Sequence, residues 1–473
     1  MIQTKKVRNF REGPILSQII KFAIPLMLTG IMQLLFNTAD TIVVGRWGGD
    51  TPEACETALA AVGSCGSLIN LITLLFMNLA LGAGVSVAQD IGAKDFDGLH
   101  KTVHTAVTLP LFLGLPVMIF GFVLARPMLT LMGTETSVLG QAVPYMTAYF
   151  CGIPASMMYN YCAAILRSSG ETARPMKYLF VGGVTNVVLN IIMVTVFHLG
   201  ALGVGIATAA SFWIACILIL IHMTHTDAAY RVEFRKLGID GKKLKRILRI
   251  GIPAGLQGMV YSVSHVVIQS SVNSLGKAVV AGNAASANLE GYVYQPMNSL
   301  YQAAVTFVGQ HKGARKYQRM KKCILYCVLC VTVIGVVLGG SMVLAAPKLL
   351  TLYIPDNVAA MTAAMTRMMI YTVPCFLLGL MEVGSGVMRG LGRSTTAMIT
   401  SLIGSVALRV LWISLMFTRF PMLEIIYVSF PVTWIITAFA HFLIAFIVLR
   451  REERRFAAEQ LAEQKADAER IEV

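Results

Sequence analysis

Long runs without a charged residue constrain this chain more than any other feature. Several of them exceed the roughly 18 residues that mark a membrane-spanning helix. They lie at 57–89, 102–125, 136–166, 178–226, 250–276, 323–347 and 425–449. Only 13% of the residues are charged, against about 25% in soluble domains. Spanning β-barrels show alternating segments of about ten residues instead. The sequence therefore predicts an all-α polytopic membrane protein.

Dividing these runs into helices of about 20 residues gives twelve transmembrane helices. We expect them at 22–45, 60–88, 102–125, 140–164, 176–197, 200–222, 250–274, 282–309, 323–346, 361–387, 395–417 and 425–449. The loops between them then divide the positive charge unevenly. Of 39 Lys and Arg residues, 32 fall on one side of the membrane and 6, Arg367 among them, on the other. Arg409 is the remaining one, and it lies inside the eleventh span.

This charge asymmetry predicts the orientation of the chain. By the positive-inside rule, both termini are expected in the cytoplasm and the protein in the cell membrane. The net charge of +15 is accounted for by anionic lipid headgroups, so we expect no nucleic-acid partner. The basic start at residues 5–8 precedes no cleavage pattern, and we expect the first span to stay as an anchor.

The chain contains an internal duplication. Three pairs of segments share a pattern and keep their order: Ile24-Pro25 with Ile252-Pro253, Val87–Lys94 with Val308–Arg315, and Leu166–Gly170 with Met388–Gly392. Six spans per half is an even number, so both halves enter the membrane in the same direction. Parallel repeats of this kind are typical of transporters whose substrate binds between the halves. We expect a lobe at 1–222, a basic linker at 223–249, a second lobe at 250–449 and a cytoplasmic helical tail at 450–473.

The motifs of the two halves also resemble a known family, that of multidrug and toxic compound extrusion (MATE) transporters, and most closely its DNA-damage-inducible F protein branch. The matching stretches are Ile24–Gly45, Thr185–Thr208, Gly251–Ala314 and Arg389–Ser394. The resemblance implies a V-shaped pair of six-helix lobes related by a pseudo-two-fold axis. It also implies export of organic, often cationic compounds in exchange for protons or sodium ions, with no cofactor.

Asp40 is the first of three carboxylates that lie clearly inside expected spans. An ionised carboxylate there costs about 2.5–3.5 kcal/mol even on insertion scales, so a functional role is favoured over a helix cap. The resemblance implies ion coupling by Asp40 together with Phe36, Asn37, Asn186, Asn190 and Thr208.

Two departures from sodium-binding relatives bear on the coupling ion. Asn190 stands where those relatives have an Asp, and Phe36 stands where they have a Tyr. Both changes remove oxygen ligands, which hard cations need, so protons are favoured over sodium ions. The alternative for Asn186 and Asn190 is plain hydrogen bonding between helices.

The other two carboxylates inside spans, Glu290 and Glu382, could face a cavity and attract a cationic substrate, or could titrate. The alternative for Glu382 is an ion pair with Arg389 or Arg409. Gln257 and Arg409 are further candidates for the substrate cavity.

These features together predict a secondary active exporter of amphipathic, cationic compounds that works as a monomer. One alternative is a flippase for lipid-linked precursors, but a diphosphate headgroup would need several arginines, and Arg409 is the one clearly inside a span. The other is a membrane enzyme or channel, which no catalytic set, metal triad or phosphate loop supports. The family resemblance adds Pro25 and Pro253 as hinge candidates, where a tolerated kink is the alternative.

Overall fold

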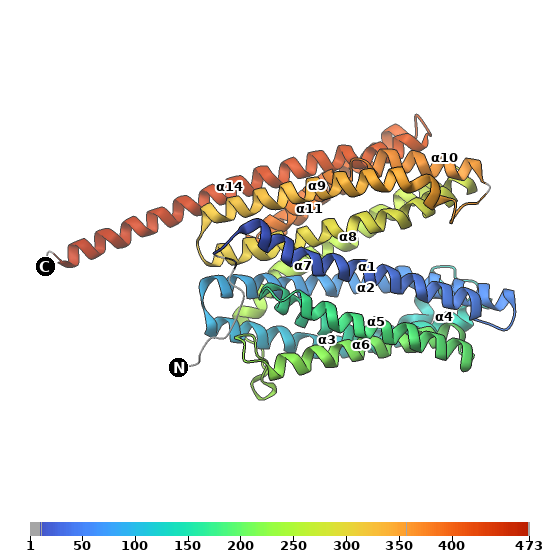
Figure 1. Ribbon diagram of the computed structural model, residues 1–473, viewed down its shortest axis with the longest axis horizontal. Helices are drawn as coiled ribbons and strands as arrows, with labels where there is room; N and C mark the ends of the chain where they lie inside the picture. The colour runs from blue at the N-terminus through green and yellow to red at the C-terminus, as the bar shows by residue number, and fades with distance from the viewer. Residues whose placement is uncertain (1–9, 11, 356, 472–473) are drawn as a thin grey trace. The chain divides into compact units, whose positions relative to one another are not determined.

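The computed structural model describes residue 10 and residues 12–355 and 357–471, and the basic start at residues 5–8 lies outside them. Within this range the chain is helical and contains no strand (Figure 1). The helices of the first half are α1 (Ile15–Trp47), α2 (Pro52–Ala93), α3 (Phe96–Leu131), α4 (Thr136–Ser168), α5 (Ala173–Ile191) with the π-helix η1 (Ile192–Val196), and α6 (Gly200–His225).

The second half repeats this series of long helices. A short 3₁₀ turn, η2 (Phe234–Lys236), precedes it. The helices are α7 (Gly241–Asn273), α8 (Lys277–Gly313), α9 (Tyr317–Leu350), α10 (Val358–Arg367), η3 (Met368–Thr372), α11 (Cys375–Gly390), α12 (Ser394–Ser401), η4 (Leu402–Ala407), α13 (Leu408–Trp412), η5 (Ile413–Phe417) and α14 (Leu423–Ile471).

Each of the twelve expected spans coincides with one of these helices or with a run of adjoining ones, which confirms the fold class. Eight helices of the described chain are long and apolar enough to cross a membrane, and a bent pair makes a ninth. The remaining three, α4, α7 and α8, carry more polar side chains. The sequence placed several span ends short of the helix ends, because helices continue past the apolar stretch into charged residues.

The chain forms two compact units. The first, called unit 1 here, contains residues 20–91 and 95–263; the second, unit 2, contains residues 12–19, 92–94 and 264–471. The expected linker at 223–249 and residues 250–263 of α7 thus pack with unit 1, although the sequence pattern placed the second lobe from residue 250 onward. Unit 1 is built on the packing of α4 against α3 and α6.

A buried carboxylate explains why the linker packs with unit 1. Asp90 near the end of α2 is only 4% exposed. It accepts hydrogen bonds from Lys243 Nζ at 2.9 Å and Arg246 Nη1 at 2.8 Å, both on α7, and from Thr102 Oγ1 of α3 at 2.5 Å. A buried charge needs such partners, because removing one leaves an uncompensated ion. Two basic residues of the linker therefore have a structural role in unit 1.

The duplication is visible in the backbone. Lys94 after α2 and Arg315 after α8 occupy equivalent positions of the repeated motif, and both adopt the left-handed conformation, with φ of 57° and 55°. Gly170 and Gly392, equivalent in the third pair of motifs, do so as well, with φ of 86° and 74°. Non-glycine residues rarely adopt this conformation. Its recurrence at matching positions supports a common origin of the two halves.

In unit 2 the tenth span is broken. The helices α10 and η3 run from Val358 to Thr372, and α11 begins at Cys375 after a bend of 44°. Arg367 is the last residue of α10, and the π-helix η3 follows it directly. π-helical segments inside longer helices occur often at functional sites.

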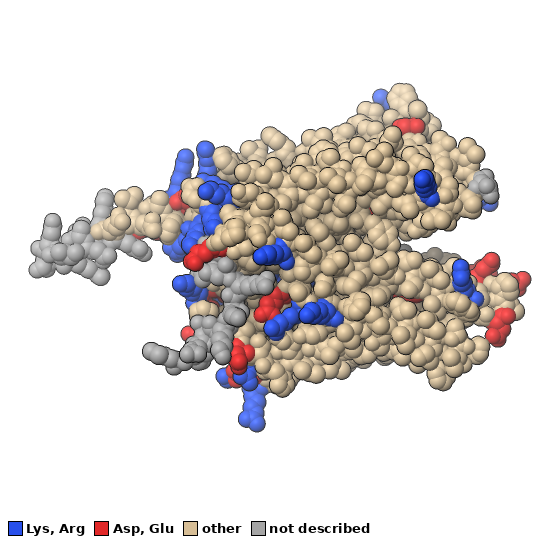
Figure 2. All heavy atoms as spheres, viewed as in Figure 1, with Lys and Arg blue, Asp and Glu red and all other residues tan. Residues whose placement is uncertain are grey.

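The last helix extends well past its apolar part. In Figure 1 the red end of α14 projects beyond the other helices of unit 2. Its first turns after the span are fixed by ion pairs of Glu452 with Lys312 at 3.0 Å and of Glu453 with Lys321 at 2.7 Å. The expected tail helix is thus a continuation of the twelfth span. In Figure 2, Lys and Arg gather at this end of the unit 2 helices.

Candidate functional site

Four of the six predicted coupling residues lie together in unit 1. Asn190 Nδ2 donates a short hydrogen bond to Asp40 Oδ1, which connects α5 to α1. It also lies 3.4 Å from Asn186 Oδ1, and Asn186 Nδ2 donates to Thr208 Oγ1 of α6 at 3.3 Å. Asn186 and Asn190 are buried, whereas Asp40 is half-buried. The result is a chain of polar groups that ends on one carboxylate.

One acceptor in this cluster is unsatisfied. The amide oxygen of Asn190 is buried and has no hydrogen-bond partner among the described residues. Buried polar atoms without a partner are rare and point to a missing donor or ion. An amide can also turn by 180° and exchange its donor for its acceptor. Asn190 can therefore donate to ionised Asp40 or accept a hydrogen bond from protonated Asp40.

Two adjacent glycines bring the three helices close enough for these contacts. A Cβ atom on Gly183 would lie 1.8 Å from Phe36 Cε2, so the Phe36 ring packs directly over the α5 backbone. A Cβ atom on Gly182 would lie 2.9 Å from the carbonyl oxygen of Ser211 on α6. Small residues at helix contacts permit such close approach in membrane proteins. Phe36 is thus a packing residue next to the cluster.

Asn37 does not join the cluster. It is exposed, and no hydrogen bond of its side chain is recorded among the described residues. The sequence did not single out Tyr145 and Tyr149 of α4, which lie close enough to Asp40 for its charge to act on their hydroxyl groups. The sequence offers one signal for these two tyrosines: they lie on the same apolar run as other residues that face inward.

The second cluster, in unit 2, differs from the sequence-based expectation. Glu290 of α8 is paired with Arg367 through two parallel hydrogen bonds, from Nε to Oε1 at 2.8 Å and from Nη2 to Oε2 at 2.6 Å. The Arg367 side chain is 12% exposed and that of Glu290 is 9% exposed. The charge count placed Arg367 in a loop on the second side, which is wrong because its guanidinium is buried against this carboxylate. Glu290 therefore presents a neutralised charge rather than a free one.

The buried arginines of unit 2 also change the expectation that Arg409 is the only one inside a span. Arg389 and Arg409 are each 5% exposed. Arg409 Nη2 donates to Thr433 Oγ1 at 2.8 Å, and its guanidinium lies 4.1 Å from the centre of the Phe430 ring. Arg389 donates to the hydroxyl of Tyr301. The sequence missed this because a position near a span end does not reveal burial.

The remaining candidates are spread over the molecule. Glu382 of α11 is half-buried and takes part in none of the ion pairs recorded between described residues, although the charge of Arg389 acts on it. Gln257 is buried in the part of α7 that belongs to unit 1. The helices α1 and α7 run without a break through the hinge candidates Pro25 and Pro253. The recorded bend lies in the tenth span instead.

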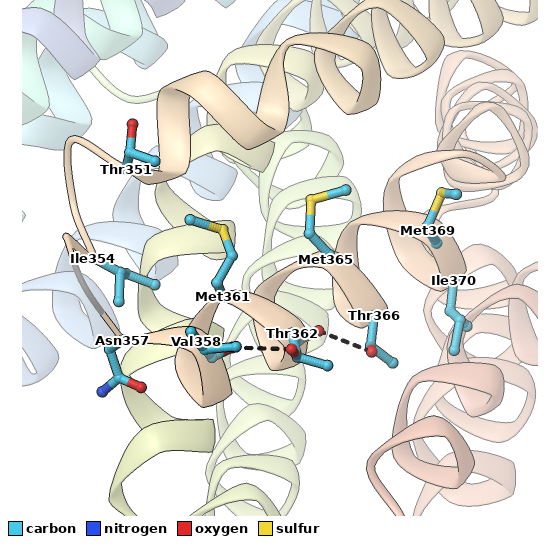
Figure 3. Close-up of a pocket in the computed structure, with 10 residues that line it drawn as sticks. All are labelled: Thr351, Ile354, Asn357, Val358, Met361, Thr362, Met365, Thr366, Met369 and Ile370. Atoms are coloured by element: carbon cyan, nitrogen blue, oxygen red, sulfur yellow. Dashed lines mark hydrogen bonds between the residues drawn. The ribbon is translucent and has the colours of Figure 1, made fainter.

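Two cavities lie within unit 2. The larger, of about 680 Å³, lies beside the start of α10. Its described lining residues are uncharged: Thr351, Ile354, Asn357, Val358, Met361, Thr362, Met365, Thr366, Met369 and Ile370. Figure 3 shows the hydroxyls of Thr362 and Thr366 bonded to the backbone of their own helix, at 2.9 Å in both cases. This cavity therefore offers a methionine-rich surface with no charged side chain among its described lining residues.

The smaller cavity, of about 330 Å³, contains the Glu290–Arg367 pair. Its other polar lining includes Asn283, Gln269 and His265. The side chain of Asn283 connects three helices, because its Oδ1 accepts from Arg367 Nη1 and from the Tyr427 hydroxyl. Pockets of this size lined by apolar groups and a few converging polar ones are typical small-molecule sites.

Comparison with known proteins agrees with this architecture. The MatE family model matches residues 25–192 and 253–413. The probable multidrug resistance protein YoeA of Bacillus subtilis is 27% identical over 379 residues, 78% of this chain and 80% of that protein. A FAD transporter of Shewanella oneidensis is 24% identical over 361 residues, 73% of this chain and 76% of that protein.

Solved structures of transporters share the fold. An outward-facing multidrug resistance MATE family transporter matches with a TM-score of 0.87 at 21% identity, over 96% of this chain and 100% of the other. A MOP superfamily transporter from Pyrococcus furiosus matches with a TM-score of 0.87 at 22% identity, over 95% and 99% of the two chains. With its twelve transmembrane helices, its duplicated motifs and a family match over most of its length, the chain belongs to the MATE family of multidrug transporters.

Proposed function

We propose that this protein is a secondary active exporter of amphipathic, mainly cationic organic compounds, driven by protons that bind at Asp40. It acts in the cell membrane as a monomer, beside anionic headgroups, with both termini in the cytoplasm and with no cofactor. The observation that carries the proposal is the hydrogen bond from Asn190 to Asp40, the single carboxylate of the cluster.

The partners of Asp40 favour a proton over a sodium ion. Asn190 can pair with either protonation state of Asp40, because its amide can turn, and its oxygen has no hydrogen-bond partner among the described residues. A sodium site would gather several oxygen ligands with more negative charge. Here Asp40 supplies the only carboxylate, and the aromatic ring of Phe36 packs against Gly183 instead of offering an oxygen.

Transport by the purified protein in liposomes tests this proposal. Ethidium export should follow an imposed pH gradient in vesicles free of sodium, and an imposed sodium gradient alone should give no export. Asp40→Asn keeps the shape of the side chain but cannot bind a proton, so gradient-driven export should fall to the level of empty liposomes.

A matched control separates coupling from folding. Asn37→Asp places an acid on the exposed residue near Asp40 that lies outside the cluster, and it should leave the pH dependence of export in place. Wild-type export that requires sodium and ignores the pH gradient would contradict the proposal, as would normal export by a folded Asp40→Asn variant.

The proposed orientation rests on the uneven distribution of Lys and Arg between the expected loops of the sequence. Single cysteines can test it in a background without reactive native cysteines. In intact cells, an impermeant thiol reagent should label D50C and M422C but miss D240C and Q460C. Labelling of D240C from outside would reverse the orientation.

A further inference from the structure

The cavity around Glu290 and Arg367 has features that the proton-coupling site in unit 1 does not use. It lies within unit 2, and its lining combines charged, polar and aromatic side chains, among them His265, Asn283, Glu290, Arg367, Tyr371 and Phe430. Ionisable residues inside membrane helices mark functional sites by default, since they are expensive to bury. A volume of about 330 Å³ admits a small organic molecule.

The backbone around Arg367 is arranged for a ligand site. Arg367 ends α10, the π-helix η3 follows it, and the 44° bend before α11 comes next. Thr372 before the bend and Cys375 after it both line the cavity. Discontinuous helices of this kind form substrate sites in transporters, because the break opens space and frees backbone groups.

The guanidinium of Arg367 is held from several sides. Asn283 accepts from its Nη1 atom. The rings of Tyr371 and Tyr427 lie 5.1 and 5.4 Å from its central carbon, in cation–π contact. These contacts leave the outer fork of the guanidinium, Nε and Nη2, to the carboxylate of Glu290. The same fork geometry binds any carboxylate or phosphate in two parallel hydrogen bonds.

We propose that this cavity binds a small aromatic organic anion, a carboxylate or phosphate, which replaces Glu290 on Arg367 while Glu290 takes up a proton. Displaced but ionised, Glu290 would be a buried charge without a partner, which is strongly unfavourable. A proton taken up from water converts the Glu290 carboxylate to a neutral carboxyl group. The site then contains one negative charge, on the ligand, and one positive charge, on the guanidinium of Arg367. The binding of each anion is therefore accompanied by the uptake of one proton. This site goes beyond the proposed coupling at Asp40 and uses no residue of unit 1.

Other groups near Glu290 must be considered as proton acceptors. From the elements packed around it these are His265 on α7, Arg367 on α10, Tyr371 on η3, Cys375 on α11 and Tyr427 on α14. Arg409 on α13 acts on His265 and Tyr371. Arginine stays charged, and tyrosine and cysteine ordinarily stay neutral below about pH 8. His265 is the one competitor for the proton near neutral pH.

Calorimetry of the full-length protein in nanodiscs, with benzoate as the probe, tests the linkage. Titrations in two buffers of different ionisation enthalpy should give an uptake of about one proton per benzoate, so its affinity should fall about tenfold for each unit rise in pH between about pH 6 and pH 8. Benzyl alcohol, which has the ring without the charge, should bind without proton uptake. No benzoate binding at the lower pH would overturn the proposal.

Variants assign the proton. In Glu290→Gln the anion should bind without proton uptake and with no pH dependence; persistence of the tenfold slope there would overturn the proposal. If that variant does not fold, His265→Gln replaces it as the test. The number of protons taken up per benzoate should then stay near one. A fall to zero would assign the proton to the imidazole of His265 and overturn the assignment to Glu290. Asp40→Asn separates the two proposals, since it should stop export but leave proton-linked benzoate binding intact.

Discussion

The two units each hold a carboxylate between membrane helices, but they surround it differently. In unit 1, Asp40 has a neutral amide as its partner, and the cluster around it contains no cation. In unit 2, Glu290 is held by the fork of Arg367. The first arrangement leaves the charge of the acid to be balanced by an ion from solution, whereas the second balances it internally. The difference teaches that the two halves of a duplicated scaffold can balance a buried acid in different ways.

The largest effect is expected where the internal balance of unit 2 is broken. Arg367→Met leaves Glu290 buried without a counter-charge and should destabilise the protein by about 3–5 kcal/mol. The double variant Glu290→Gln with Arg367→Met removes both charges and should recover most of this loss. Thermal unfolding followed by circular dichroism in one detergent measures both. A double variant as unstable as the single one would show that the two residues are not a pair.

The packing that positions the unit 1 cluster should be nearly as sensitive. Gly183→Ala places a methyl group into the ring of Phe36 and should cost about 1–3 kcal/mol, with reduced export because α1 moves away from α5. Gly140→Ala is the matched control, since nothing lies within 4 Å of its added Cβ atom. Thermal unfolding and ethidium export of the two variants can be compared side by side. Equal behaviour would remove the glycine contact from the explanation.

A change of charge should shift unit 1 toward sodium. Asn190→Asp adds a second carboxylate beside Asp40, and export should become stimulated by sodium, with an apparent sodium affinity about tenfold higher than in the wild type, or about 1.4 kcal/mol. Export rates at several sodium concentrations and constant pH measure the effect. Unchanged sodium dependence would mean that the missing carboxylate is not what sets ion preference.

The smallest effect is expected for the substitution of Asp240, an acid outside both clusters. The same substitution separates the effect of pH on folding from its effect on transport. The Asp240 carboxylate accepts the backbone N–H of Lys243 at the start of α7, at 2.9 Å, and this lowers the pKa of Asp240. Because the pKa of Asp240 is lower in the folded state, its ionisation stabilises the fold at pH values above the pKa of the unfolded state. This stabilisation is lost as the pH falls through the pKa of the folded state. Asp240→Asn should therefore slightly lower the unfolding temperature at neutral pH but not near pH 3, with export unchanged. An equal loss at both pH values would exclude ionisation as the cause.

The sequence predicted the helices well because an apolar run of sufficient length has few alternatives in a membrane. The resemblance to the MATE family also led to the prediction that Asp40, Asn186, Asn190 and Thr208 belong together. The sequence could not predict the pairing of Glu290 with Arg367, which are separated by 77 residues and come from different helices. The π-helical segments and the glycine contacts were missed as well, since they depend on how neighbouring helices pack.

The burial of Asp90 was missed for a related reason. It follows an uncharged run, four residues before Lys94, and looks like an ordinary loop residue. Its partners Lys243 and Arg246 belong to a basic stretch that the charge count explained by orientation alone. A position near a span end is compatible with exposure or burial, and only the packing of the linker decides between them.

The ion pair of unit 2 has an electrical consequence. Glu290 and Arg367 together carry no net charge, so a membrane voltage does no net work when the pair changes its depth in the bilayer. A single charge that crosses 100 mV gains or loses about 2.3 kcal/mol. No counter-charge of this kind is recorded for Asp40 among the described residues, and the charge of Asp40 changes whenever it binds or releases a proton. The Glu290–Arg367 pair should therefore contribute little to the voltage dependence of the transport cycle, whereas Asp40 should contribute to it.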